Sequence, residues 1–369
     1  MDKVPTWLNE GFLQTVLQGG ESIQPRVTVV SYTARPAIAA GENFSSYLFR
    51  VNVTYRVGES PKEHSQSLIV KLPVQGGFIY DLAKHTEFYD KEPVFYERIL
   101  PKMNEKLNCE FSPTAFYSPL DKVVVQSDLA PDYHVGDKEN QLDYAHAKLF
   151  YTILAKFHAS ALAVHRDDPK LFESVKGETL YSAGSALQGW IELGTKVIGE
   201  ILSEMDDGKQ YADFFLSRVA TIWDSAVEGV KPKYRVNCQL HGDSWTNNLM
   251  FKYNSSKEPI DLKIIDYQIS RYTTPALDIM YFMYTSCKYD VRQRQKELYE
   301  VYLETFNNSL ERLGCPERMS LEQLKEDFKL AAPFFITTIV FGLTPIMAVG
   351  TAEGDSFEGF SAEDIRTGR

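Results

Sequence analysis

The sequence is poor in several features that would direct it toward particular classes of protein. Its four cysteines are widely scattered, with no C-x-x-C pair and no histidine placed to suggest a metal site, so we expect free thiols. Basic residues are outnumbered, with 39 Lys and Arg against 50 Asp and Glu, which argues against nucleic acid as a partner. The first residues show no basic-then-apolar leader pattern. We therefore expect a cytoplasmic protein.

Long hydrophobic runs are also scarce. Residues 331–350 carry no charge and are long enough to span a bilayer, but Pro333 and Pro345 interrupt them, which favours buried helices of a globular protein. With 369 residues, 44% of them hydrophobic and 13% aromatic, the chain suits a globular protein of two lobes. We expect no membrane partner and no obligate protein partner.

What the sequence does contain is a loop with acidic and amide side chains at a characteristic spacing, HGDSWTNN over residues 241–248. Asp243 and Asn248 match H-x-D-x-x-x-x-N, the protein-kinase catalytic loop, with Gly242 in place of its arginine. A short apolar strand then ends at Asp266. Phosphoryl transfer needs a carboxylate beside the attacking hydroxyl and oxygen ligands for Mg²⁺. We assign Asp243 to the first task and Asn248 with Asp266 to the second.

The N-terminal part is rich in predicted strands. Residues 26–32, 46–56 and 67–72 have β-branched or alternating apolar side chains. Small residues separate the first two strands, at a turn where a kinase lays backbone N–H groups over the nucleotide phosphates. We predict nucleotide contacts from this turn at Asn43, Phe44, Ser45 and Ser46.

A lone lysine, Lys71, lies near the end of the third predicted strand, as the phosphate-contacting lysine of kinases does. The charged, helix-forming stretch that follows offers Glu92 as its ion-pair partner. Because Pro93 is tolerated mainly in the first turn of a helix, Glu92 would lie at the very start of that helix. Glu87 and Glu97 therefore remain alternative partners for the lysine.

A further apolar strand runs into a hinge at Ser127 and Leu129, whose backbone we expect to contact the nucleotide. The hinge divides the chain into a predicted N-lobe over residues 1–126, which opens with a short amphipathic helix, and a C-lobe over residues 127–369. The C-lobe contains most of the predicted helices.

Together these segments closely resemble the ecdysteroid kinase-like, or CHK kinase-like, proteins of insects, within the aminoglycoside/choline kinase-like superfamily. The resemblance covers nearly the whole chain and is carried by GENFSSYLFRV (41–51), FYERILP (95–101), LAKFHASAL (154–162), HGDSWTNNLMFKY (241–253) and residues 265–282. It implies an α+β, two-lobed protein kinase-like fold with a small antiparallel-sheet N-lobe and a large, mostly helical C-lobe. It also implies transfer of phosphate, dependent on ATP and Mg²⁺, to a hydroxyl of a small molecule.

The resemblance makes an ecdysteroid, or a related steroid or xenobiotic alcohol, the expected acceptor. A choline- or ethanolamine-type kinase is the alternative enzyme, and a non-catalytic small-molecule binding protein is the alternative of another class. The large side chains near the catalytic motifs fit either an aromatic cage for a cation or a broad apolar wall. They are Trp245, Tyr267, Tyr272, Met280, Tyr281, Met283 and Tyr284.

Two further features bear on the site. At the hinge, Ser127-Asp128 stands where the family often has an acidic pair, which puts one side-chain contact to the nucleotide in doubt. His241 and Asp278 are expected to brace the catalytic loop without touching the reacting groups. The lysine, both aspartates and the asparagine of the motif are all present, which argues against a carrier without catalysis.

Overall fold

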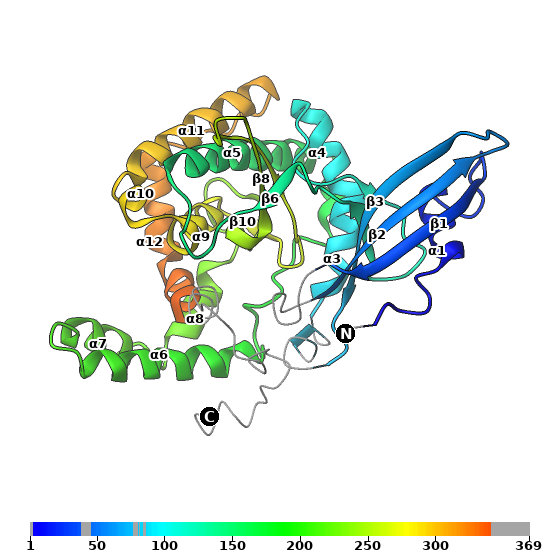
Figure 1. The fold of residues 1–369 in the computed structure, drawn as a ribbon. Coiled ribbons are helices and arrows are strands. Elements are labelled where there is room, and N and C mark those ends of the chain that lie inside the picture. The colour runs from blue at the N-terminus through cyan, green and yellow to red at the C-terminus, as the bar shows by residue number, and fades with distance from the viewer. Residues whose placement is uncertain (1–2, 38–45, 77–79, 81, 84–85, 341–369) are drawn as a thin grey trace.

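The computed structural model describes residues 3–37, 46–76, 80, 82–83 and 86–340. The chain builds a twisted antiparallel sheet from its N-terminal part and a larger, mostly helical body from the rest (Figure 1). These two parts lie side by side, and the catalytic-loop motif lies in the helical body.

The N-terminal sheet has five strands, and every neighbouring pair is antiparallel. Their order is β1 (Val27–Pro36), β2 (Ser46–Val57), β3 (Glu63–Pro73), β5 (Val124–Ser127) and β4 (Ala115–Phe116). Alternate residues of β2, namely Phe49, Val51 and Val53, are buried, because successive side chains of a strand point to opposite faces. They form one core with helix α1 (Glu10–Gln18), which ends at Gly19 with φ of 81°.

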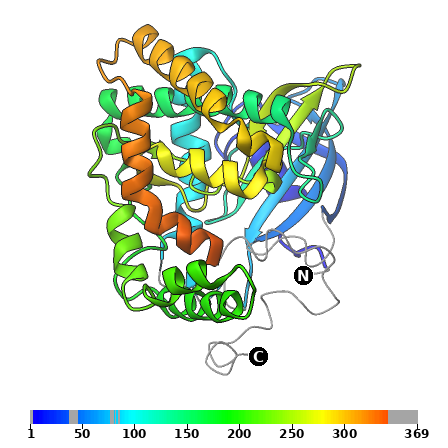
Figure 2. The same ribbon diagram turned by 90° about the vertical axis from the view of Figure 1, so that its left-hand side faces the viewer.

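The longest described helix of the body is α5 (Tyr144–Asp167), which begins where the Asp143 carboxylate accepts the N–H groups of Ala145 and His146. Further helices of the body are η2 (Pro169–Phe172), α6 (Leu187–Ser203), α7 (Lys209–Leu216), α8 (Ile222–Gly229), α9 (Ala276–Ser286), α10 (Tyr289–Gln293), α11 (Gln295–Arg312) and α12 (Leu321–Thr338). Helix α11 packs along α5, whereas α6 and α7 lie at the other end of the body (Figure 1 and Figure 2).

Two small sheets carry the motif residues inside this body. One pairs β7 (Cys238–Leu240) with β10 (Arg271–Thr273). The other has three strands, in the order β6 (Tyr133–Val135), β8 (Leu249–Tyr253) and β9 (Pro259–Ile264).

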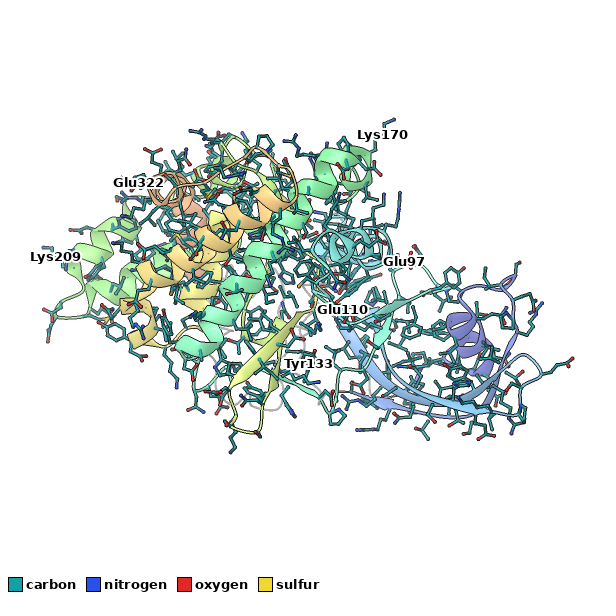
Figure 3. The ribbon with its side chains drawn as sticks, turned by 90° about the horizontal axis from the view of Figure 1, so that it is seen from above. Glu97, Glu110, Tyr133, Lys170, Lys209 and Glu322 are labelled. Atoms are coloured by element: carbon teal, nitrogen blue, oxygen red, sulfur yellow. The ribbon has the colours of Figure 1, made fainter. Side chains whose placement is uncertain are left out.

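The helix that joins sheet and body corrects one detail of the prediction. Glu92 lies in the middle of α3 (Phe88–Val94), and Pro93 is accepted inside this helix. The chain then widens into a π-helical turn, η1 (Phe95–Ile99), before it continues as α4 (Leu100–Leu107). Glu87 and Glu97 are exposed, and Figure 3 shows Glu97 on the helix that stands between sheet and body.

The apolar run near the C-terminus begins within α12, which passes through Pro333 to Thr338, while residues 341–350 lie outside the described part of the chain. Within the part that the structure describes, no helix combines the length and the apolar character needed to cross a membrane.

Taken together, the small antiparallel sheet and the large helical body form the two-lobed, protein kinase-like α+β fold that was predicted. Strand β5 completes the sheet at Ser127, close to the predicted division between residues 126 and 127. The exact division of the chain into domains stays a prediction.

Candidate active site

The catalytic-loop motif lies between two strands of different sheets. Strand β7 ends at Leu240, the chain passes through the loop and the short helix η3 (Thr246–Asn248), and β8 begins at Leu249. The N–H of Ile265 donates to the carbonyl oxygen of Asn248 at 3.0 Å, which extends the ladder between β8 and β9. Because of this pairing, the amide of Asn248 and the carboxylate of Asp266 come to the same end of the ladder.

Asp243 is held by two donors, one on each carboxylate oxygen. The Tyr281 hydroxyl donates to Oδ1 at 2.6 Å, and the Asn248 side-chain amide donates to Oδ2 at 3.0 Å. Burial raises the pKa of Asp243, and the charge of Asp266 adds to this, while the bonds from Tyr281 and Asn248 pull the pKa back down. The net direction is upward, so the carboxylate is a stronger base than an exposed aspartate.

Lys71 of β3 lies between two carboxylates. Its Nζ is 2.8 Å from Glu92 Oε2 and 3.0 Å from Asp266 Oδ1, and the lysine is only 6% exposed. Burial alone would lower the pKa of Lys71, but the charges of Asp266 and Glu92 outweigh it and raise the pKa overall. The lysine is therefore a fixed positive charge, and Glu92, rather than either exposed glutamate, is its partner.

Asp278 of α9 braces the catalytic loop from below. Its carboxylate accepts the backbone N–H of His241 at 2.8 Å and that of Gly242 at 2.9 Å, and it contacts His158 Nε2 at 3.1 Å. Burial alone would raise the pKa of Asp278. Its hydrogen bonds with His158 and the Gly242 N–H, together with the electrostatic effect of His158 and His241, outweigh burial and lower the pKa overall. His158 is itself completely buried and bonds Tyr302.

His241 fixes the loop to the strand that ends before Asp266. Its Nε2 lies 2.9 Å from the carbonyl oxygen of Ile265, while its Nδ1 accepts the N–H of Asp243 at 3.2 Å. These two bonds require the proton on Nε2, because Nδ1 is the acceptor. The contacts of His241 and Asp278 agree with the bracing role predicted for both.

The segment after β9 is locked by packing on both sides of its acidic residue. Asp266 has a φ of 71°, a backbone conformation that side chains other than glycine seldom adopt. The Tyr267 ring is fully buried and stacks on Phe95, with ring centroids 4.4 Å apart. The Gln268 amide donates to the Ser46 hydroxyl at 2.9 Å and so ties the segment to β2. Such packing can hold a strained aspartate in place.

The residues predicted to bind a cation fit Mg²⁺. The Asn248 side-chain nitrogen donates to both the carbonyl oxygen and the carboxylate of Asp243, which leaves Oδ1 as the atom available to a cation. Asp266 offers a carboxylate next to it. In the described part of the chain, no three His, Cys, Asp or Glu side chains gather into a metal site. Mg²⁺ usually takes one or two protein oxygens and completes its shell with phosphates and water, so the oxygens of Asn248 and Asp266 would suffice to hold it.

The other predicted nucleotide contacts are only partly described. Asn43, Phe44 and Ser45 lie outside the described residues, whereas Ser46 begins β2. The hinge residues Ser127 and Leu129 lie at the end of β5, where the backbone of Ser127 bonds Thr114 at 2.8 Å. Their roles toward a nucleotide stay predictions.

The aspartate at the hinge has a structural role. Asp128 accepts hydrogen bonds from Arg50 Nε at 2.6 Å and the Ser67 hydroxyl at 2.8 Å, both from strands of the sheet. Its carboxylate therefore anchors the hinge to the N-terminal sheet and is already occupied.

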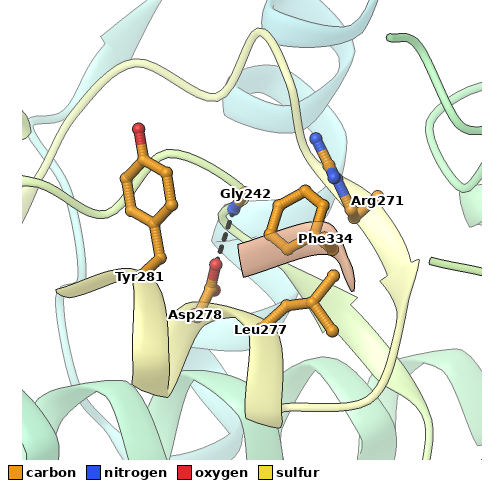
Figure 4. A pocket seen from close by; sticks show the side chains of 6 residues that line it. All are labelled: Gly242, Arg271, Leu277, Asp278, Tyr281 and Phe334. Atoms are coloured by element: carbon orange, nitrogen blue, oxygen red, sulfur yellow. Dashed lines mark hydrogen bonds between the residues drawn. The ribbon is translucent and has the colours of Figure 1, made fainter. Parts of the chain in front are cut away.

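Two residues of the site were not identified from the sequence in these roles. Tyr281, predicted only as part of a substrate wall, bonds Asp243, and Arg271 was not singled out at all. Both line a small recess beside the catalytic loop (Figure 4). Arg271 opens a three-residue strand, Arg-Tyr-Thr, and no pattern in the sequence marks it as a site residue.

The fold and the arrangement of these side chains define a class. A lysine held between two carboxylates, facing a loop that presents a third carboxylate, is typical of the protein kinase-like phosphotransferases. The chain belongs to the ecdysteroid kinase-like family, whose sequence profile matches residues 40–315. It is accordingly a phosphotransferase that acts on hydroxyl groups of small molecules.

Solved structures with a similar course of the chain are also small-molecule kinases. An ethanolamine kinase from Plasmodium vivax is 13% identical, with a TM-score of 0.42 over 86% of this chain and 77% of that one. A macrolide 2'-phosphotransferase from Brachybacterium faecium is 13% identical, with a TM-score of 0.41 over 85% and 89%. No curated protein matches the chain. Because these identities and TM-scores are low, the assignment rests on the family match.

Proposed function

We propose that this protein transfers the γ-phosphate of ATP, in the presence of Mg²⁺, to a hydroxyl of a bulky, uncharged alcohol, an ecdysteroid or a related steroid or xenobiotic alcohol. The observation that supports this most is the position of Lys71, 2.8 Å from Glu92 and 3.0 Å from Asp266. It places a fixed cation for the phosphates beside the carboxylate suited to Mg²⁺. The family supports the choice of acceptor.

In this mechanism Asp243 receives the acceptor hydroxyl. Each of its oxygens already accepts one hydrogen bond and keeps a lone pair for the incoming O–H. The acceptor oxygen forms a bond to the γ-phosphorus, the bond to the bridging oxygen of ADP breaks, and the hydroxyl proton passes to Asp243 and then to solvent. The raised pKa of Asp243 favours this transfer, because a base works best when its pKa is near the working pH.

The other residues position the reactants and neutralise negative charge on the phosphates. Lys71 would contact the α- and β-phosphates, with Glu92 fixing its position. Asn248 Oδ1 and Asp266 would hold Mg²⁺, which when bound offsets negative charge on the transferring group. The backbone of residues 43–46 would cover the phosphates, and that of Ser127 and Leu129 would contact the base. Asp278 keeps the loop in place through two backbone N–H groups.

The test is ATP consumption by the purified protein with Mg²⁺ and a panel of acceptors: ecdysone, plant-type glucosides, choline and ethanolamine. We expect choline and ethanolamine to be at least ~10-fold poorer in kcat/KM than the best steroid, about 1.4 kcal/mol of discrimination. If choline outpaces every steroid and glucoside, the protein is a choline-type kinase. If no acceptor raises ATP consumption above that of Asp243→Asn, the proposal is wrong.

A further inference from the structure

Arg271 of β10 is a buried cation whose hydrogen-bond donors lack acceptors. The residue is 2% exposed, and its Nε and Nη1 find no hydrogen-bond acceptor among the described residues. Its guanidinium lies beside a pair of rings that contact each other, 5.6 Å from the centroid of Tyr181 and 5.1 Å from that of Phe334. Leaving such donors unpaired is costly, so a group that accepts from them is expected when the protein is in use.

The position of Arg271 connects it to the catalytic loop. In the β7–β10 pair it lies opposite Leu240, immediately before the loop. It lines the recess together with Gly242, Asp278 and Tyr281, and in Figure 4 Arg271 and Tyr281 extend toward the same side of that recess. Because the Tyr281 hydroxyl bonds Asp243, this side of the recess is continuous with the carboxylate that would receive the acceptor hydroxyl.

The charges around Arg271 indicate what kind of group would bind it. Glu178 Oε2 lies 3.3 Å from Nε and balances the charge of the guanidinium, although the two atoms are not aligned for a hydrogen bond. The other oxygen of Glu178 accepts the N–H groups of Leu180 and Tyr181, which fixes the carboxylate in place. The Glu178 carboxylate would therefore repel an anionic ligand, whereas an uncharged oxygen could accept hydrogen bonds from Nε and Nη1 of Arg271 without that repulsion.

A cationic acceptor is disfavoured at the same place. Besides Arg271, the buried Lys91 points toward this region and donates to the carbonyl oxygen of Ser270 at 3.0 Å. A positively charged ligand in the recess would face both side chains in an environment where water does not screen them. The electrostatics thus favour a neutral, oxygen-bearing molecule over a quaternary ammonium.

We propose that Arg271 is a specificity-determining residue, which donates hydrogen bonds to a second, uncharged oxygen of the acceptor while Asp243 receives the reacting hydroxyl. This rests on the proposed function and narrows its acceptor to an alcohol with a further hydroxyl or carbonyl group. The recess has no room for a water molecule in this structure, so the Phe334 ring over the guanidinium would have to move aside before that oxygen could enter.

The test compares kcat/KM for ecdysone with that for a set of ecdysteroids, each lacking one oxygen. For Arg271→Gln we expect kcat/KM with ecdysone to fall ~10-fold or more below the wild-type value, while the KM for ATP stays unchanged. With the one analogue that lacks the recognised oxygen, the variant and the wild type should have the same kcat/KM. Arg218→Gln, which removes an exposed arginine from the surface near α7, is the matched control and should match the wild type with every acceptor.

A second variant covers the case in which Arg271→Gln does not fold. Arg271→Lys retains the charge beside Glu178 but loses the planar pair of donors, so it should keep the melting temperature and show the same oxygen-specific loss. An equal loss with every analogue, or no loss in either variant, would overturn the role of Arg271 while leaving the proposed function intact. If the wild type phosphorylates none of the steroids, both proposals fail.

Discussion

The Tyr281 hydroxyl donates a hydrogen bond to Oδ1 of Asp243 at 2.6 Å. Tyr281 belongs to helix α9, which strands β8, β9 and β10 separate from the catalytic loop in the sequence. This bond stabilises the charged form of the carboxylate, in opposition to burial, which raises its pKa. Tyr281 therefore limits how far the pKa of Asp243 rises, and replacing it should change the pH dependence of the reaction.

Replacing Tyr281 with Phe should move the acid limb of the kcat profile to higher pH. Asp243 must be deprotonated to accept a proton, so activity is lost as the pH falls through its pKa. Because the hydrogen bond from Tyr281 stabilises the charged form, losing it raises that pKa further. The profile is measured at saturating ATP, Mg²⁺ and acceptor. Tyr284→Phe, on the exposed side of the same helix, is the control, and coinciding limbs in both variants would refute the assignment.

The two motif aspartates should separate into different kinetic effects. Asp243→Asn should retain ATP binding but lower kcat by at least ~10²-fold, the lower end of contributions from a general base. Asp266→Asn should instead weaken the binding of ATP in the presence of Mg²⁺, because it removes a partner of Lys71 and the carboxylate that we propose for Mg²⁺. Calorimetric titration with Mg·ATP distinguishes the two. Near wild-type turnover of Asp243→Asn would mean that the catalytic loop is misassigned.

The local part of the site could be predicted from the sequence because its residues are neighbours in the chain. The loop from His241 to Asn248 and the strand that ends before Asp266 keep their spacing whatever the rest of the fold does. The three long strands β1 to β3 were likewise predicted, although β1 continues to Pro36, beyond the predicted end at residue 32. Alternation of side chains marks a strand better than it marks the residue where that strand stops.

Contacts between distant segments could not be read from the pattern. Pro93 pointed to a helix start at Glu92, but the helix begins at Phe88, and Pro93 is the sixth of its seven residues, just before a π-helical turn. The bond from Tyr281 to Asp243 depends on how α9 packs on the loop. The unpaired Nε and Nη1 of Arg271 follow from its burial beside the Tyr181 and Phe334 rings, which no local signal encodes.

Asp278 should contribute to stability in a way that depends on pH. Its folded-state pKa is lowered, so its contribution is present above the unfolded value of about 3.9 and is lost as the pH falls through the folded pKa. Asp278→Asn turns an amide N–H₂ toward one of these two donors, the backbone N–H of His241 or that of Gly242, at a cost of ~3 kcal/mol at pH 7. The difference in unfolding free energy between the wild type and Asp278→Asn, measured by urea unfolding, should decrease in strong acid. The exposed Asp290→Asn should show no such difference, and an equal loss in both variants would contradict the prediction.

Gly242 should not tolerate a side chain. It has a φ of 90°, and an added Cβ would come within 2.9 Å of the Ile269 carbonyl carbon and closer still to its oxygen. We expect Gly242→Ala to lose at least ~2 kcal/mol of unfolding free energy. Gly189→Ala is the matched control, because that glycine lies in α6 with no atom near its Cβ position and should gain up to ~1 kcal/mol. Equal stability of the two variants would show that the backbone yields at position 242.

The same glycine bears on regulation. In many protein kinases an arginine before the catalytic aspartate gathers a phosphate from the activation loop, and the crowding at position 242 excludes any such side chain here. The chain also passes from Asp266 into β10 at Arg271 and on to α9 at Ala276, which leaves no long segment to be ordered by phosphorylation. We therefore expect phosphatase-treated and mock-treated enzyme to have the same kcat and the same KM for ATP. Loss of activity after phosphatase treatment, restored by a protein kinase, would contradict this.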